Sequence, residues 1–441
     1  MSRFNYNTEK KDLIPDKLVS RSVFPANDEE TIRTDMFIRR YNNLKSRLKR
    51  LKHNLTSIEA TKNSKNAGNI CVTFGLVVKG LSSDYCLEDD TDQIHLDFEG
   101  TEFVEGCYFM ENCFYIIEGF YDGIVENLKV LKIALPPIES VNQLRSVIGT
   151  TNLFGTKSKK CVSSNSELKR IEQNNPDIFF VLINEFWLDS TKCIQNFEKM
   201  LSGFITNQAI PAAFVITGNF SCQAHMNELV AINNYQQIFL SFAKNLHDNF
   251  REISSQSRFI FVPGTKDPGP INQMLPRPAM LKQISQKVQK FLPNAVFTSN
   301  PCRIQYCSKE IVICKLDLSR VMDLLTIDRS IKHIEKSMEE KVNAVVQTVK
   351  SQAHLCPLPI DIQPVLDTKD HCLELTAFPD LLVYGEGALN IRQFNHQGVV
   401  SPGSFGERSL FQVYFPANGH VEDSEITADE ADETIGNASK F

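Results

Sequence analysis

Three kinds of hydrophobic pattern follow one another along the 441 residues of the chain. Apolar residues first recur at steps of four and three, which predicts an amphipathic helix over 37–52. Short, glycine-punctuated strands follow, and then apolar runs that alternate with helical patterns. This order predicts five segments. They are an N-terminal extension over 1–66, a β-barrel domain over 67–140, a linker over 141–176, an α/β domain over 177–423 and an acidic flexible tail over 424–441.

The predicted helix has one apolar and one basic face. The apolar face carries Phe37, Tyr41, Leu44, Leu48, Leu51 and Leu55. The basic face carries Arg39, Arg40, Lys45, Arg47, Lys49, Arg50 and Lys52, and no acidic residue falls between Met36 and Ile58. A basic amphipathic helix can contact nucleic acid or a membrane surface. It can equally pack on the next domain and leave its basic rim in solvent, and the sequence leaves these interpretations open.

The strand-rich segment predicts a small Greek-key barrel such as an OB-fold. It contains no Lys or Arg between Leu81 and Leu128, whereas acidic residues are frequent there. Because OB barrels hold single strands in a positively charged groove, this charge favours a protein-binding module. The segment's aromatic residues are then interpreted mostly as barrel core. They are Phe103, Tyr108, Phe109, Phe114 and Tyr115.

The C-terminal half of the chain has the pattern of a covered parallel sheet. Apolar runs at 177–183, 212–217, 258–263 and 295–298 predict buried strands, and helical patterns lie at 190–206, 224–252 and 279–291. A hairpin of 303–306 with 310–316, a helix over 329–352 and further strands in 371–423 follow. Within the linker, the polar run of 150–170 predicts a loop.

Composition excludes few classes of protein. The formal net charge is -6, and 12 cysteines occur without a CxxC pair, which favours buried reduced thiols in a cytosolic or nuclear protein over zinc ligands. No apolar run approaches the roughly 20 residues of a membrane span, and the N-terminus has no secretory h-region. The acidic tail is either solvated or a docking segment.

Strings at the predicted strand ends point to a known family. In order they are DIFFVLINEFWLDS, AAFVITGNFSC, FIFVPGTKDPGP, QAHLCPLP, FPDLLVYGEG and VVSPGSF. This series resembles the B-subunits of eukaryotic replicative DNA polymerases, those of polymerase epsilon above all, over nearly the whole chain. The resemblance implies an α/β protein, α+β overall, with an OB-fold followed by a calcineurin-like phosphoesterase α/β sandwich. The sequence departs from the family pattern in one respect. Family members usually carry a small helical domain ahead of this point, and this sequence has no room for one.

Active phosphoesterases of that fold hold two metal ions with acids and imidazoles from five motifs, and two such ions clamp phosphoryl oxygens and activate a water. Aligned to those motifs, the chain has lost most ligands, and Lys266 places a cation where an imidazole would bind one. Asp267, His354 and Glu386 remain, too few for one divalent site. The degenerate positions are Asn184, Phe186, Asn219, Cys222, Thr265, Lys266, Asp267, His354 and Glu386.

The resemblance therefore implies a non-catalytic scaffold subunit without metal or other cofactor. Its implied partner is the C-terminal region of the catalytic subunit of polymerase epsilon, with other replisome subunits, in the nucleus and away from membranes. DNA contact would be mostly indirect, with the basic helix as the place for any direct contact. Two alternatives are a single-strand-binding OB protein and a divergent metal-dependent phosphodiesterase.

Overall fold

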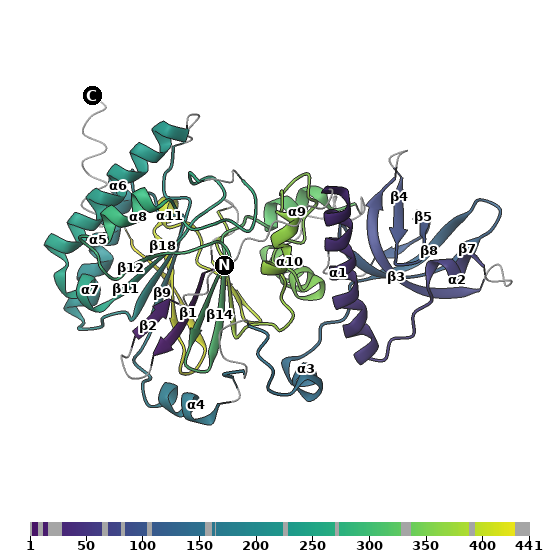
Figure 1. Ribbon diagram of the computed structural model, residues 1–441, viewed down its shortest axis with the longest axis horizontal. Coiled ribbons are helices and arrows are strands. Elements are labelled where there is room, and N and C mark those ends of the chain that lie inside the picture. The colour runs from purple at the N-terminus through teal and green to yellow at the C-terminus, as the bar shows by residue number, and fades with distance from the viewer. Residues whose placement is uncertain are drawn as a thin grey trace.

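The chain's structure is a computed structural model that describes residues 2–7, 12–15, 29–63, 69–80, 84–103, 108–154, 161–163, 165–223, 228–269, 273–327, 337–387 and 393–427 (Figure 1). The described residues form three sheets, of which one closes into a barrel and two face each other. The first part of the helix predicted over 329–352, part of the predicted loop and most of the acidic tail lie outside the described residues.

The barrel has the strand order of an OB-fold. Its first strand, β3, pairs antiparallel with both β4 and the long β7, and β5 pairs parallel with β8 to close the sheet. Side chains alternate along β5, so that Ile94 and Leu96 point into the core. The strands are β3 (Ile70–Lys79), β4 (Tyr85–Glu88), β5 (Gln93–Asp97), β6 (Glu102–Phe103), β7 (Phe114–Asp122) and β8 (Asn127–Ala134).

Helix α1 (Glu29–Arg50) lies between the barrel and the α/β domain (Figure 1). Tyr41, Leu44 and Leu48 are buried, and the Tyr41 ring stacks on Phe74 with centroids 5.3 Å apart. Phe114 belongs to the same cluster, so this aromatic residue packs against α1 on the barrel's outer surface. The short helix α2 (Ile58–Lys62) follows.

The linker between the two domains is more ordered than the sequence predicted. It contains α3 (Val141–Ile148) and α4 (Ser166–Gln173), although 150–170 was expected to be a loop. Ser140 and Gln143 form a capping box on α3, and the Asn165 side chain caps α4. Both helices are eight residues long, too short for a clear apolar period, and local caps decide their ends.

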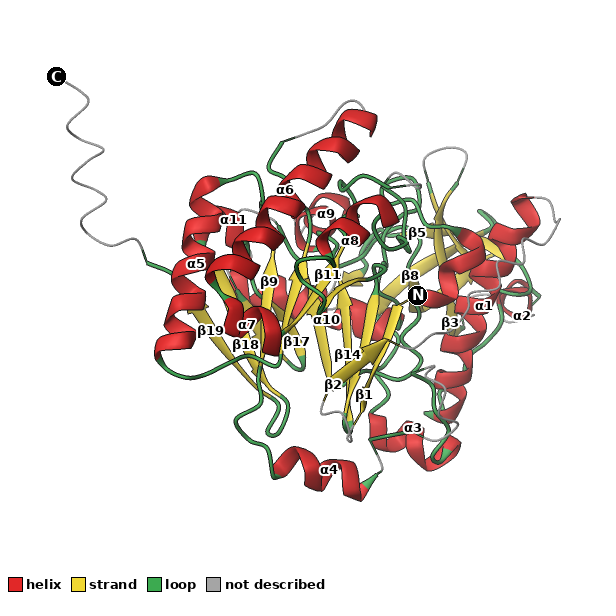
Figure 2. Ribbon diagram, turned by 60° about the vertical axis from the view of Figure 1, so that its left-hand side comes forward, coloured by secondary structure: helices red, strands yellow, loops and turns green. Residues whose placement is uncertain are grey.

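The α/β domain is a sandwich of two sheets between layers of helices (Figure 2). One sheet has the order β12-β11-β10-β9-β18-β19, and its first four strands are parallel. Its strands are β9 (Phe180–Asn184), β10 (Ala213–Thr217), β11 (Arg258–Val262), β12 (Ala295–Phe297), β18 (Leu410–Phe415) and β19 (His420–Glu425). These parallel strands fall on the four predicted apolar runs.

The second sheet has the order β16-β17-β15-β14-β13-β1-β2. It includes the predicted hairpin and, unexpectedly, the N-terminal residues, because β1 pairs parallel with β13. Its strands are β1 (Ser2–Asn7), β2 (Asp12–Pro15), β13 (Cys302–Tyr306), β14 (Lys309–Cys314), β15 (Leu381–Tyr384), β16 (Phe394–His396) and β17 (Val399–Ser401). From the sequence, residues 1–66 were predicted to be an extension with one helix. Strands of four and six residues give too little pattern to predict such a long-range pairing.

Helices cover both outer faces of the sandwich. One layer packs on the β9 sheet through a phenylalanine-rich core. The other layer joins the β14 sheet to the barrel in one continuous core that includes Tyr115, Val345 and Leu382. The helices are α5 (Thr191–Thr206), α6 (Glu228–Asn249), α7 (Arg251–Gln256), α8 (Lys282–Val288), α9 (Ser319–Leu325), α10 (Met338–Gln352), the 3-10 helix Asp367–Cys372 and α11 (Phe405–Arg408). No described helix combines the length and apolarity needed to cross a bilayer.

Candidate functional site at the carboxyl edge of the sandwich

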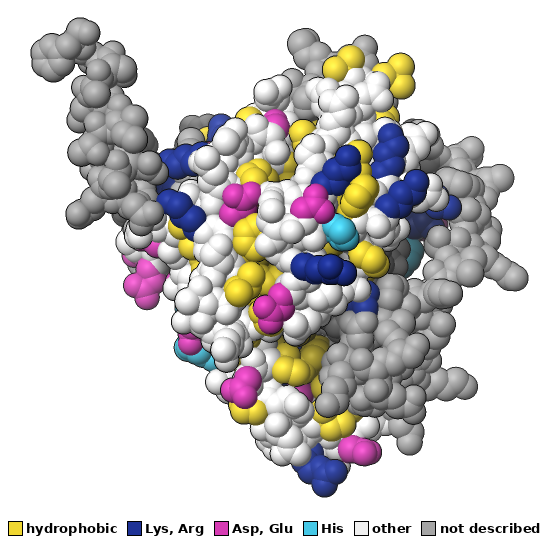
Figure 3. Space-filling model, turned by 90° about the vertical axis from the view of Figure 1, so that its left-hand side faces the viewer, with side chains coloured by type: hydrophobic (Ala, Val, Ile, Leu, Met, Phe, Trp, Pro, Cys, Tyr) yellow, Lys and Arg dark blue, Asp and Glu magenta, His cyan; other side chains and the backbone are white. Residues whose placement is uncertain are grey.

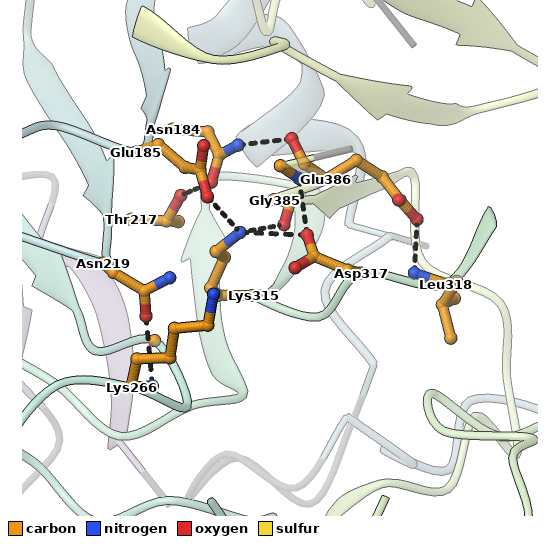
Figure 4. Close-up of polar contacts among 12 residues, drawn as sticks. Asn184, Glu185, Thr217, Asn219, Lys266, Lys315, Asp317, Leu318, Gly385 and Glu386 are labelled. Atoms are coloured by element: carbon orange, nitrogen blue, oxygen red, sulfur yellow. Dashed lines mark hydrogen bonds and ion pairs between the residues drawn. The ribbon is translucent and has the colours of Figure 1, made fainter. Parts of the chain in front are cut away.

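Most of the residues singled out in the sequence lie where the central strands end. Asn184 ends β9, Asn219 follows β10, and Asp267 follows β11. Because the carboxyl ends of parallel strands meet at one edge, these side chains converge, as ligands do in open α/β sheets. Figure 4 shows that the loops after β14 and β15 bring Lys315, Asp317 and Glu386 to the same edge.

The amide of Asn184 is fully used by its own chain. Its Nδ2 donates to the carbonyls of Glu386 at 2.6 Å and Gly403 at 3.2 Å, and its Oδ1 accepts from the Thr217 hydroxyl at 2.8 Å. Asn184 is 0% exposed. An amide oxygen that already accepts a hydrogen bond in a closed site is a poor ligand for an incoming cation.

A lysine ammonium occupies the centre of this edge. Lys315 Nζ lies 3.4 Å from Oε1 of Glu185 and 3.2 Å from Oδ1 of Asp317, and donates to the Gly385 carbonyl at 2.8 Å (Figure 4). Burial lowers the pKa of Lys315, but Asp317 and Glu185 outweigh it and leave that pKa raised. The ammonium therefore stays charged beside these two carboxylates. In turn it holds the pKa of Asp317 low against burial.

Asp267 accepts hydrogen bonds from the loops after β10 and β11 and from helix α6. Its Oδ1 accepts from Phe220 N and the Tyr235 hydroxyl, each at 2.8 Å, and its Oδ2 accepts from Gly264 N at 2.7 Å. Burial raises the pKa of Asp267 despite these donors. A Cβ on Gly218 would overlap the carboxylate, so only glycine allows this approach. The carboxylate thus holds the loops together.

The neighbouring motif positions are occupied in the same way. Lys266 donates its backbone N–H to Asn219 Oδ1 at 3.1 Å, while its side chain is exposed. The Thr265 carbonyl accepts from Arg277 Nη1 at 3.1 Å. Cys222 is exposed, and burial and nearby Asp189 raise the pKa of its thiol. The thiol is therefore not predisposed to bind a metal as a thiolate.

Phe186 lies inside the helical layer. Its ring centroid is 4.7 Å from that of Phe197, 5.4 Å from Phe242 and 5.7 Å from Phe405, and the residue is 0% exposed. These separations are those of favourable aromatic pairs. The side chain at this position now stabilises the packing of α5, α6 and α11 on the β9 sheet.

Glu386 contributes its backbone, not its carboxylate, to the cluster around Lys315. The carboxylate accepts from Leu318 N at 2.8 Å and from the Ser319 hydroxyl at 3.0 Å, at the start of α9. Burial, with Asp317 nearby, raises the pKa of Glu386 to about 7. At neutral pH this group is thus poised between its two protonation states.

His354 belongs to a different cluster. Its Nε2 lies 3.1 Å from Oδ1 of Asp370, a carboxylate that also accepts from Arg40 and, at 3.0 Å, from Arg39 of helix α1. Arg39 Nε also donates to Glu374 at 2.6 Å. Burial and Arg40 lower the pKa of His354. Burial opposes ionisation of Asp370, but His354 and Arg40 outweigh it and hold the pKa of Asp370 far below the ordinary range. This cluster fastens α1 to the α/β domain.

Other cations of α1 also face groups of this chain. Lys45 Nζ lies 2.7 Å from Asp90 of the barrel, and Arg50 Nη2 lies 2.6 Å from Glu139. Arg47 is 7% exposed and donates to the carbonyls of Lys350 and Ser351 at the C-terminal end of α10. Burial lowers the pKa of Arg47 to about 10. The basic face, for which the sequence left contact with nucleic acid or a membrane and a solvated rim both open, is thus largely directed toward groups of the chain itself.

Two cations of that face, Lys49 and Lys52, are exposed and make no ion pair with a described residue. Contact of α1 with nucleic acid stays a prediction, and it now depends chiefly on these two residues. The acidic barrel residues that the sequence showed are partly explained by α1 and α2, since Lys62 also pairs with Asp92 at 2.7 Å.

The donor set at the carboxyl edge does not fit a two-metal phosphoesterase centre. Among the described residues there is no group of three or more His, Cys, Asp or Glu side chains arranged to hold a metal ion. At this edge the amides of Asn184 and Asn219 already form hydrogen bonds within the chain, and the Asp267 carboxylate accepts from three donors. The buried Lys315 ammonium lies beside two further carboxylates. A divalent cation next to that ammonium would meet like charge at short range. The residues at this edge therefore do not supply the ligands that a two-metal hydrolysis requires.

The OB barrel and the two-sheet sandwich with this edge define the class, the B-subunits of DNA polymerases. The family model for the B-subunits of DNA polymerases alpha and epsilon matches residues 180–396. A model described as DNA polymerase epsilon subunit 2-like, OB-fold domain, matches 27–137 and so includes α1 with the barrel. The predicted fold class is confirmed.

Individual relatives show which polymerase the chain's family belongs to. The chain is 31% identical to DNA polymerase epsilon subunit 2 of Bos taurus over 446 aligned residues, which cover 96% of this chain and 81% of the relative. It is 30% identical to the Homo sapiens protein of the same name with the same coverage. It is 28% identical to the Drosophila melanogaster protein of that name over 80% of this chain and 65% of the relative. The chain belongs to the family of DNA polymerase epsilon second subunits, as the resemblance predicted.

Lys315 and Asp317 were not among the site residues predicted from the sequence. In CKLDL, Lys315 lies near the end of the predicted hairpin strand 310–316 and Asp317 directly follows it, so both look like ordinary strand-end charges. A usable signal existed, because Glu185 directly follows the β9 run and a charged residue at that edge requires a partner. The sequence could not identify which of the cations supplied it.

Proposed function

We propose that this chain is a non-catalytic accessory subunit of DNA polymerase epsilon that binds the C-terminal region of the catalytic subunit in the nucleus. Its relatives over 96% of its length are second subunits of that polymerase, which supports the assembly. The observation that carries the non-catalytic part is the buried Lys315 ammonium between Glu185 and Asp317. That ammonium pairs with the carboxylates that could otherwise bind a metal ion. The chain would then keep the phosphoesterase-like fold without metal-dependent catalysis.

The continuous core between barrel and sandwich supports a scaffold role. Helix α1 contacts both domains through Tyr41 and through the Arg40–Asp370 ion pair. The two domains can then present one rigid face to a large obligate partner. We place the interaction with other subunits of the polymerase on the same scaffold.

The binding test is coexpression of the chain with the C-terminal region of the catalytic subunit. The two should copurify as a complex that survives high salt, because obligate interfaces are largely apolar. The N-terminal polymerase region of the same subunit is the matched control and should not be retained. A chain that stays a stable monomer with both regions would contradict the proposal. Nuclear residence is tested by imaging a fluorescent fusion in cells that also produce the catalytic subunit.

The enzymatic alternative is tested with bis-p-nitrophenyl phosphate and manganese. We expect no turnover above buffer from the purified chain. Asp267→Ala is the control for contamination. Activity that copurifies with the wild type and disappears in this variant would support a divergent phosphodiesterase instead.

The single-strand-binding alternative has less support. Tyr108, Phe109 and Tyr115 of the barrel are at most 1% exposed, so they are not available as stacking platforms. Asp89 and Asp90 add negative charge next to α1, where Asp90 pairs with Lys45. These features favour a barrel that binds protein.

A further inference from the structure

Helices α6 and α8 lie side by side on the outer face of the β9 sheet (Figures 1 and 2). Their contact is fixed by buried residues, including Phe239 and Ile284 in the core beneath them. Lys287 Nζ also donates to Gln236 Oε1 at 2.7 Å across the two helices. Exposed side chains of this pair form a surface on the side of the two helices that faces away from that core.

This surface, called here the α6–α8 surface, consists of lysines, amides and a hydroxyl. Its members are exposed, and those on α6 recur at steps of four and three, which places them on one helical face. The lysines are Lys244, Lys282, Lys287 and Lys290, and the neutral polar residues are Asn233, Gln237, Ser241, Gln283 and Gln286.

The surface lacks carboxylates. No Asp or Glu occurs between Leu229 and His247 or between Met280 and Asn294. The next acid along α6 is Asp248, which is 2.8 Å from His247 Nδ1 at the end of the helix. In a chain with a net charge of -6, two stretches with lysines and no acid, over 229–247 and 280–294, are a marked local departure. The acids of α6 lie at its two ends, at Glu228 and Asp248.

The ammonium groups are free of ion pairs within the described residues. Lys287 contacts a neutral amide, and Lys244 lies over the Phe291 ring at 5.5 Å from its centroid. Neither Lys282 nor Lys290 has a described carboxylate as a partner. This differs from α1, where most cations face carboxylates or carbonyls of the chain itself. Figure 3 shows several Lys and Arg side chains on this side of the molecule, with Asp and Glu side chains among them.

We propose that the α6–α8 surface binds the sugar-phosphate backbone of a nucleic acid without reading its sequence. Lysines, amides, hydroxyls and the absence of carboxylates match the side chains that contact phosphate oxygens. The binding free energy comes largely from release of counterions condensed on the polyanion, which exposed and unpaired ammonium groups can replace. The surface thereby gives the assembled polymerase a weak, sequence-independent contact with its template or product.

An acidic polypeptide is the competing occupant, and the surface fits it less well. Protein interfaces obtain most of their affinity from apolar anchors in a buried centre. On the described parts of these two helices, the strongly exposed large apolar residues are Leu229 and Val230, in the first turns of α6. The lysines themselves are surrounded by amides, which bind phosphate oxygens but form no apolar anchor.

The test is fluorescence anisotropy of the full chain with a labelled DNA duplex of mixed sequence over a series of salt concentrations. The variant Lys244→Gln/Lys287→Gln/Lys290→Gln removes three positive charges and replaces them with a residue of similar helix propensity. The plot of log affinity against log salt should become shallower by about 0.9 for each phosphate that is no longer bound, a total of about two to three. Affinity at low salt should fall about tenfold or more.

The matched control is Lys79→Gln/Lys169→Gln/Lys192→Gln, which removes three exposed charges outside both this surface and α1. It should keep at least most of the wild-type salt slope, and both variants should retain the catalytic subunit in the coexpression test. Equal binding by wild type and the first variant would overturn the proposal, as would an equal loss in the control. A labelled peptide of residues 424–441 that binds more tightly than DNA and loses binding in the first variant would assign the surface to an acidic segment instead.

Discussion

Lys315 and Asp317 form an ion pair at the carboxyl edge of the sandwich, with Nζ 3.2 Å from Oδ1, and the lysine side chain is 3% exposed. The same ammonium faces Glu185 at 3.4 Å. Glu185 and Asp317, whose side chains are 10% and 39% exposed, both face this base, so removing it leaves a largely buried Glu185 carboxylate uncompensated. The site is therefore a structural counterpart of a metal centre in which the cation is covalently part of the chain.

The first prediction follows from that ion pair. Lys315→Met should lower the free energy of unfolding by about 3–5 kcal/mol, because breaking a buried pair leaves uncompensated charge. Urea denaturation followed by circular dichroism measures the change. Lys266→Met is the control, since its ammonium is exposed, and it should change stability by no more than about 0.5 kcal/mol. Equal stability of the two variants would mean that the ammonium does not hold the acids in place.

The second prediction concerns the protonation of Glu386. Its pKa is raised to about 7 by burial and by Asp317, from an ordinary value of 4.5. Between these two values the folded state binds more protons than the unfolded state, so the free energy of unfolding falls as pH rises. Glu386→Gln removes this dependence. From pH 4.5 to pH 7.5 the wild type should lose up to about 3 kcal/mol more than the variant.

The comparison of the two curves isolates Glu386. Glu310 also has its pKa raised to about 7, but it titrates in both chains and cancels in the difference. His354 has its pKa lowered and acts in the opposite direction, again equally in both. Parallel stability curves for wild type and variant would contradict the prediction.

The third prediction concerns the fastening of α1. Asp370→Asn leaves Arg40, which is 7% exposed, without its carboxylate and should cost about 3–5 kcal/mol. Hydrogen exchange of the α1 amides should accelerate well before global unfolding, because the helix loses its anchor on the α/β domain. Asp90→Asn breaks the half-exposed pair with Lys45 and should cost about 1 kcal/mol or less. Unchanged α1 protection in Asp370→Asn would show that the apolar contacts with Phe74 suffice.

The sequence predicted the elements whose signal is local. The apolar runs that became β9 to β11 are buried along their length, which makes them easy to distinguish from surface strands. The β1–β13 pairing and the short linker helices were missed because long-range pairing and side-chain caps decide them. Each of these elements has only four to eight residues, so the sequence of each one contains too few apolar positions to indicate where it packs.

The candidate site was predictable only in part. Strand-end position brought Asn184, Asn219 and Asp267 to one edge, as parallel pairing requires. Motif order alone associated His354 with that edge, and its hydrogen bonds are instead to Asp370 and Cys356. Likewise, the partners of the α1 cations lie up to 335 residues away in sequence, so their inward direction had no local signal.

The fourth prediction concerns the position at which an imidazole would be needed for metal binding. Phe186→His would place a polar ring among the rings of Phe197, Phe242 and Phe405. None of these three phenyl rings can accept a normal hydrogen bond from the imidazole N–H. The change should cost about 3 kcal/mol or more, whereas Phe186→Leu should cost less because it leaves a cavity without an unpaired donor. Thermal and urea unfolding of both variants measure the difference. If the histidine variant matched the leucine variant in stability and gained manganese affinity, this edge would have kept a capacity for metal that its present donor set does not indicate.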